Sequence, residues 1–198
     1  MAQMGDACSA GRRTPREVLM QEHRVIEKVL DATERMLWSG TTDRDFLTRA
    51  LDFFRNYADR CHHAKEEGEL FPVLETLGVP REGGPIGCML QEHDEGRHLL
   101  GVVADNLEAA QRGDRTATHN LHQAARRYVA MLRQHIQKED NVLFVMADQL
   151  LGPDEQQQML EAFDRAQRSD DGVARHERYE SLAEELFQWE FAPASGKR

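Results

Sequence analysis

The stretch "CHHAKEEGELFP", residues 61–72, decides how the chain is interpreted. Residues 62–70 within it hold two histidines and three glutamates, on what the neighbouring apolar residues predict to be the inner face of a helix. A buried charge is unfavourable by several kcal/mol unless it is paired or bound to a metal ion. The stretch therefore predicts a compensating partner for these side chains inside the protein.

The composition is typical of a soluble globular protein. The 198 residues carry a formal net charge of −10, with 40% hydrophobic and 30% charged residues. We expect no nucleic-acid partner, because phosphate binding needs a concentrated basic surface. We expect no membrane partner either, because no apolar run is long enough to span a bilayer. Three cysteines without framework spacing favour a cytoplasmic location.

Apolar residues recur at intervals of three and four along nearly the whole chain, which predicts an all-α protein. Four long helices are expected at residues 15–38, 43–77, 86–112 and 115–150, followed by two shorter ones at 154–168 and 174–189. Thr14 as N-cap and Pro15 in the first turn mark the start of the first helix, and Pro72 is expected to kink or stop the second near its end.

This pattern predicts an up-down-up-down four-helix bundle of two repeated helical hairpins, with the two shorter C-terminal helices packed outside it. The expected division of the chain is a flexible leader at 1–14, the bundle at 15–150, a C-terminal helical extension at 151–190 and a flexible tail at 191–198.

An internal repeat relates the two hairpins. "LMQEH" at 19–23 recurs as "MLQEH" at 89–93, and "HHAKEEGELF" at 62–71 recurs as "HIQKEDNVLF" at 135–144. The offsets are 70 and 73 residues, so both halves carry the motifs in the same order. Lysines align only when His62 is matched to His135, and both halves then read His-x-x-Lys-Glu.

The repeated residues suit metal binding. A histidine and a glutamate four residues apart project from one face of a helix, as His62 and Glu66 do in the first half and His135 and Glu139 in the second. His23 and His93 add one imidazole from each of the other two long helices. An isolated pair of this kind is usually a helix-surface pair, but its duplication on apolar stripes favours two metal ions, with iron or manganese suited to the mixed ligands.

These motifs resemble the hemerythrin-like family, also called the hemerythrin HHE cation-binding domain, over residues 15–150. The resemblance implies a four-helix bundle around an oxo- or hydroxo-bridged non-haem di-iron centre, with manganese or zinc as substitutes. It also implies four terminal ligands and two bridging carboxylates. The terminal ligands are His23, His62, His93 and His135, and the bridging carboxylates are Glu66 and Glu139.

The chain departs from the oxygen-carrying hemerythrins beyond His93. They place a second histidine one turn after this ligand, where this chain has Arg97. One iron is therefore expected to lack a protein nitrogen, which leaves positions for water, peroxide, nitric oxide or a carboxylate. Gly96 is expected to leave room for such a ligand. Arg97 is expected either to hydrogen-bond a bound peroxide or a carboxylate ligand, or to pair with a glutamate on the bundle surface.

Several neighbouring residues have weaker expectations. Glu22 and Glu92 each precede a repeated histidine and are expected to orient imidazoles by hydrogen bonding. His63 and Glu67 follow two of the expected ligands and are expected at the edge of the site or in solvent, because an α-helix turns about 100° per residue. The remaining candidates are expected to be bystanders: His176 and Glu180 in "HERYE", and Cys61 and Cys88.

The expected function is the binding of oxygen, peroxide or nitric oxide in oxygen handling or in oxidative or nitrosative stress. Two alternatives stay open. One is a di-iron oxidoreductase that disproportionates peroxide or reduces nitric oxide. The other is an iron sensor or store that signals metal occupancy to a partner. The residues also leave open whether the chain is a monomer or a homodimer.

Overall fold

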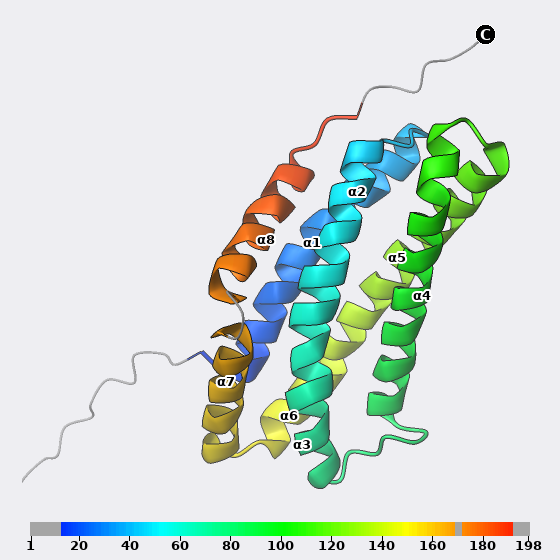
Figure 1. Cartoon of the computed structure of the whole chain (residues 1–198). Helices are drawn as coiled ribbons and strands as arrows, with labels where there is room; N and C mark the ends of the chain where they lie inside the picture. Colours follow the sequence, from blue (N-terminus) through cyan, green and yellow to red (C-terminus); the bar gives the residue numbers. More distant parts are fainter. Residues whose placement is uncertain (1–12, 169–171, 192–198) are drawn as a thin grey trace, which may run out of the picture.

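The computed structural model describes residues 13–168 and 172–191, and all regular secondary structure within them is helical (Figure 1). The expected all-α class is confirmed. Residues 1–12, which include Cys8 and most of the expected leader, lie outside the described residues, as do residues 192–198 of the expected tail.

Capping explains where the first helix begins and ends. Helix α1 spans Pro15–Ser39. The Thr14 side chain accepts a hydrogen bond from the Glu17 N–H, and the Glu17 carboxylate accepts one from the Thr14 N–H, which satisfies two donors at the helix start. Gly40, at φ 70°, ends the helix in the left-handed conformation that glycine adopts without strain.

The second and fourth long helical segments contain π-helical turns, labelled η. The second consists of α2 (Arg44–Phe53), η1 (Phe54–His63), η2 (Glu66–Leu70) and α3 (Phe71–Thr76). The fourth consists of α5 (Arg115–Lys138), η3 (Glu139–Leu143) and α6 (Phe144–Leu150). Since η2 and η3 begin at the two repeated glutamates, the local geometry follows the sequence repeat. Such π turns are frequent at functional sites.

The second segment passes Pro72 and ends at Thr76. Pro72 lies in the first turn of α3, directly after η2, so the helical path continues through the proline and ends about one turn beyond it.

The remaining helices complete the bundle. Helix α4 (Pro85–Gln111) packs along α5, and both α5 and η1 contact α1. Helices α7 (Pro153–Arg168) and α8 (Gly172–Phe187) lie outside these segments, with α8 packed along α1 and α2 (Figure 1). No helix in the described part of the chain is long and apolar enough to cross a membrane.

The buried apolar side chains form two clusters with a polar layer between them. On α1, His23 lies between Leu19 of one cluster and Ile26 of the other. On the second segment, Glu66 lies between Ala58 and Leu70 in the same way. Hydrophobic burial on both sides therefore holds the polar side chains inside the protein.

Truncation of the larger apolar cluster tests the packing. Leu30→Ala is expected to lower the free energy of unfolding by about 2–5 kcal/mol, because Leu30 is fully buried and its loss leaves a cavity. Trp38→Ala on the same helix is the control and should change stability by less than about 0.5 kcal/mol, since the Trp38 side chain is exposed. Urea unfolding monitored by circular dichroism measures both. Equal losses for the two variants would contradict this packing.

Candidate metal centre

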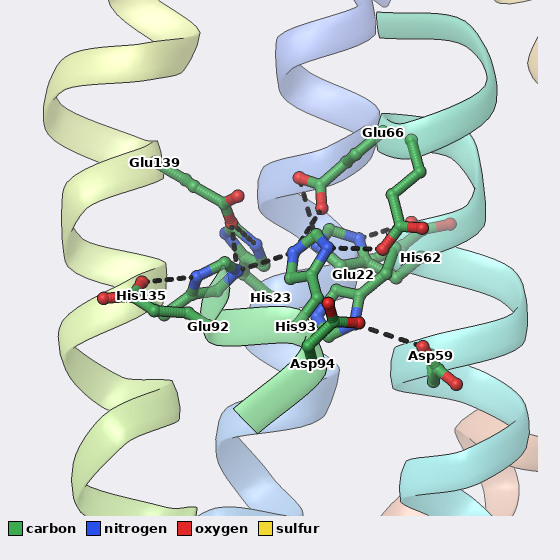
Figure 2. A network of polar contacts seen from close by, with 12 residues as sticks. Glu22, His23, Asp59, His62, Glu66, Glu92, His93, Asp94, His135 and Glu139 are labelled. Carbon is green, nitrogen blue, oxygen red and sulfur yellow. Dashed lines mark hydrogen bonds and ion pairs between the residues drawn. The ribbon is translucent and has the colours of Figure 1, made fainter. Parts of the chain in front are cut away.

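The six side chains expected as metal ligands converge in the polar layer (Figure 2). A seventh side chain, His63, joins them. Their donor atoms form two groups, and within each group the atoms lie within 4.8 Å of one another. All seven residues are buried. The first group is His23, His62, Glu66 and Glu139, and the second is His63, Glu66, His93 and His135.

The two carboxylates lie between imidazoles of both hairpins. Glu66 places Oε1 3.6 Å from Nε2 of His62 and Oε2 3.5 Å from Nε2 of His93. Glu139 places Oε2 3.2 Å from Nε2 of both His23 and His135. Each carboxylate therefore faces one histidine from its own helix and one from the other hairpin. That is the placement required of a carboxylate that bridges two ions.

The outer nitrogens of four imidazoles are held by carboxylates. A carboxylate only accepts hydrogen bonds, so Nδ1 of each ring donates to it and Nε2 is the ring atom that faces inward. The pairing repeats in both halves, with Nδ1 to oxygen distances of 2.6 Å for His23 with Asp140 and His93 with Glu67, and 2.9 Å for His62 with Glu22 and His135 with Glu92.

Most of the inner atoms lack hydrogen bonds. Nε2 of His23 and of His62, and all four carboxylate oxygens of Glu66 and Glu139, are buried without a hydrogen-bond partner among the described residues. The exceptions are Nε2 of His93 and Nε2 of His135, which lie 3.2 Å apart. A buried polar group without a partner costs about 1–3 kcal/mol, and more if it is charged. Metal cations would saturate all of these atoms at once, so the residues present fit a metal site.

The titration of the carboxyl groups points the same way. Burial and the neighbouring Glu139 raise the pKa of Glu66 well above its usual range. Burial would also raise the pKa of Glu139, but the adjacent His135 and His23 lower it well below its usual range. Without a cation the cluster therefore favours one charged and one protonated glutamate. A pair of metal ions would allow both to ionise.

Aromatic rings close the polar layer on one side. The Phe144 ring stacks on His23 with ring centroids 5.4 Å apart, and Phe71 stacks on His93 at 6.0 Å. The two phenylalanines occupy equivalent positions in the repeat, and both are buried. These rings exclude water from the inner nitrogens and restrict the rotation of the imidazoles.

The expectation that His63 lies at the edge or in solvent is wrong. Its ring is buried and stacks on His93 with centroids 3.8 Å apart, and neither of its nitrogens has a hydrogen-bond partner. It ends η1, whose wide turns rotate successive side chains by less than an α-helix does, so both His62 and His63 face inward. His63 therefore places a protein nitrogen near His93, at the metal position that the sequence predicts to lack a nitrogen ligand.

Glu67 and Arg97 form a polar contact behind His93. Arg97 donates hydrogen bonds to Glu67 at 2.6 Å, Asp59 at 2.8 Å and Asp94 at 3.0 Å, and its side chain is partly exposed. Of its expected roles, Arg97 therefore has the one at the surface, where it pairs with carboxylates. One of them is Glu67, which accepts the hydrogen bond from His93. Glu67, expected at the edge or in solvent, is half-buried, and the hydrogen bond from His93 lowers its pKa.

Gly96 does not open space for a ligand. A Cβ atom at this position would lie 3.2 Å from Cε of Met131 and 3.4 Å from the Tyr128 ring. The absence of a side chain instead lets α4 approach α5 closely. The expected space beside Gly96 is therefore occupied by core side chains.

The sequence repeat also contains a pattern from which the outer carboxylates could have been predicted. Glu67 and Asp140 occupy equivalent positions, each directly after a central glutamate. Lys65 and Lys138 are likewise equivalent, and each makes an ion pair with the glutamate expected to orient an imidazole, Glu22 or Glu92. Cys61 and Cys88 lie next to these lysines, at Sγ to Nζ distances of 3.6 and 3.9 Å.

Substitution of a central carboxylate tests the metal fit. Glu66→Gln is expected to leave the stability of the metal-free protein within about 1 kcal/mol, because its raised pKa means that an amide replaces a protonated carboxyl group. Added metal should stabilise the wild type by about 2.7 kcal/mol when the metal concentration is 100 times its Kd. The Glu66→Gln variant should lose most of this stabilisation. Glu69→Gln, one turn further along, is the control. Thermal melts with and without metal measure both effects, and an undiminished metal-dependent shift in Glu66→Gln would refute the site.

Replacement of His63 tests the added ligand. His63→Phe keeps an aromatic ring against His93 but removes both nitrogens, so we expect at least about tenfold weaker binding at one of two metal positions. His98→Ala, an exposed histidine on α4, is the control. Titration calorimetry on the metal-free protein measures the affinities. Unchanged affinity at both positions in His63→Phe would mean that His63 only packs.

The comparisons with known proteins cover the part of the chain that contains these residues. The family model of the hemerythrin HHE cation-binding domain matches residues 14–147. The uncharacterized protein Rv1995 of Mycobacterium tuberculosis (strain ATCC 25618 / H37Rv) is 28% identical over 156 residues, which cover 76% of this chain and 60% of that protein. No solved structure matches the chain significantly.

Relatives named iron-sulfur cluster repair protein YtfE also match. The Edwardsiella ictaluri (strain 93-146) protein is 34% identical over 104 residues, covering 51% of this chain and 46% of the relative. The Escherichia coli O157:H7 protein is 33% identical over 88 residues, covering 43% and 40%. The chain thus spans between two fifths and three fifths of these relatives. With its repeated donors aligned inside the matched region, the chain belongs to the hemerythrin HHE cation-binding domain family.

Proposed function

We propose that the chain is a non-haem di-iron protein that binds oxygen, peroxide or nitric oxide at its buried centre, in oxygen handling or in oxidative or nitrosative stress. One observation carries the proposal: buried imidazole nitrogens and carboxylate oxygens from both hairpins converge in two groups, and most of these atoms have no hydrogen bond among the described residues. The proposal takes the four long segments as an up-down-up-down bundle, the architecture in which facing helices hold paired metal ions.

The donor set favours iron among the common metals. Imidazole and carboxylate ligands suit iron, and they suit manganese and zinc as substitutes. The donors fall into two groups that share Glu66, which supports two ions rather than one. Cys61 and Cys88 are absent from both groups, so the part of the chain that the structure describes brings no thiolate, the ligand that favours zinc or iron-sulfur clusters, to the centre.

The side chains around the centre suit a small ligand. Two iron ions, when bound, would supply electrons and coordination positions for a diatomic molecule or peroxide. Phe71 and Phe144 stack on two of the imidazoles and cover the polar layer on one side, which favours a small ligand over a large substrate. The four outer carboxylates hold the imidazoles in fixed orientations, so a ligand could bind without rearrangement of the protein.

Repair of iron-sulfur clusters is a second candidate function, supported by the name of the YtfE relatives and by their 32–34% identity to this chain. In that role the buried centre would supply iron to a damaged cluster. Iron-loaded protein would then restore a cluster-dependent enzyme after nitric oxide treatment, whereas a ligand-binding protein would only protect the enzyme beforehand.

Reconstitution tests the leading proposal. Protein loaded anaerobically with ferrous iron is expected to retain about two irons per chain after desalting. Its visible spectrum should change when the protein is rapidly mixed with nitric oxide, oxygen or peroxide. A His135→Ala variant should lose iron and the spectral response, because its Nε2 faces Glu139 at 3.2 Å.

Two results would contradict the proposal. One is retention of fewer than one iron per chain under conditions in which the protein is folded. The other is an iron-loaded protein whose spectrum is unchanged by all three molecules. Continued consumption of peroxide or nitric oxide beyond one equivalent would instead identify an enzyme at the same centre.

A further inference from the structure

A histidine of the C-terminal extension reaches the metal centre. His176 on α8 places Nε2 3.2 Å from Oε1 of Glu22, and the other oxygen of Glu22 lies 2.9 Å from Nδ1 of His62. His176 falls beyond residues 14–147, the part of the chain matched by the family model. A continuous line of polar contacts therefore runs from α8 through Glu22 to an imidazole whose inner nitrogen faces Glu66.

The His176 ring is held in place for this contact. It lies 5.0 Å from the Tyr57 ring, measured between centroids, and its Nδ1 lies 3.5 Å from Oε1 of Glu180 one turn along α8. These contacts direct Nε2 at Glu22, which is almost entirely buried. Lys65 pairs with the same Glu22 oxygen and lies 3.6 Å from Cys61, so its ammonium group already supplies a positive charge to two members of the group formed by Glu22, Cys61 and His176.

The equivalent carboxylate of the second hairpin has different surroundings. The partners of Glu92 within the described residues are His135, Lys138 and Cys88, and its side chain is 20% exposed compared with 3% for Glu22. Helix α8 thus supplies one half of the repeated network with an additional donor. The two metal positions differ as a consequence, although the sequence repeat makes their ligands nearly equivalent.

We propose that His176 is a positioning residue that holds Glu22, and through it His62, and so couples the docking of α8 to metal occupancy at the His23–His62 position. The inference rests on the proposed metal centre but not on which small molecule binds there. Outer partners of ligating histidines fix ring orientation and raise ligand basicity. Because coupling between two sites is reciprocal, a metal ion held by His62 also stabilises the docked α8.

Metal release tests the positioning role. Full-length protein loaded with ferrous iron is mixed with excess chelator, and release from the wild type is expected in two phases. His176→Ala should accelerate one phase by about tenfold, the lower end of the range of about 10–100-fold seen when partners of ligating histidines are lost. The other phase should not change. His176→Gln places an amide nitrogen where Nε2 was and should restore the wild-type rate.

The control separates positioning from loosened packing. Glu184→Gln removes the 2.7 Å ion pair between Lys28 on α1 and Glu184 on α8, which lies outside the line of contacts to His62. It should leave both release phases unchanged. Identical release by His176→Ala and wild type would overturn the inference, as would equal acceleration by the Ala, Gln and Glu184 variants.

Hydrogen exchange gives a readout independent of release. Amide protection of α8 is expected to rise when the wild type is loaded with iron, and this dependence should vanish in His176→Ala but persist in Glu184→Gln. If the amide protection of α8 in the wild type is the same with and without iron, the coupling is refuted. A wild type that binds no iron would refute the proposed function itself, so the two failures are distinguishable.

Discussion

The architecture depends on one electrostatic constraint, the burial of imidazole nitrogens and carboxylate oxygens that face each other, most of them without a hydrogen bond among the described residues. Two apolar clusters enclose these atoms from opposite sides, and Phe71 and Phe144 cover the rings. The burial of apolar surface therefore forces the polar layer inside. Outer carboxylates satisfy one nitrogen of each of four rings and leave the other directed inward. Cations at the centre balance this arrangement at the least cost.

The duplication of the hairpin explains the regularity of the site, and two departures from it explain the differences between its halves. His63 has the buried Ile136 as its counterpart in the second half, so only one group gains a further imidazole. Helix α8 covers Glu22 but not Glu92. Both departures distinguish the two donor groups, which would otherwise be near copies, and two ions held by them would have different surroundings.

Much of the fold and the site could be read from the sequence. Apolar spacing, together with Thr14 as N-cap and Pro15 in the first turn, predicts the helices to within a few residues, because these signals are local. The repeat selects the six central side chains and aligns His62 rather than His63 with His135. When inward-facing histidines and glutamates lie four residues apart on duplicated helices, few other pairings between them are possible.

The rest depends on geometry that spacing does not carry. His63 faces inward because η1 is a π-helix, whereas a rotation of 100° per residue directs it away. Gly96 meets Met131 and Tyr128 because α4 and α5 approach closely, and Arg97 turns to carboxylates at the surface. The contact between His176 and Glu22 joins residues 154 positions apart, outside the repeat. Periodicity alone cannot predict a contact of this kind.

X-ray absorption at the iron edge of the loaded protein tests the central claim most directly. The account predicts imidazole and carboxylate ligation together with an iron–iron vector no longer than about 4 Å, the upper end of the separation usual for two-metal sites. A spectrum with oxygen ligands only, or one without a second iron nearby, would contradict the claim that the two hairpins together hold a pair of metal ions.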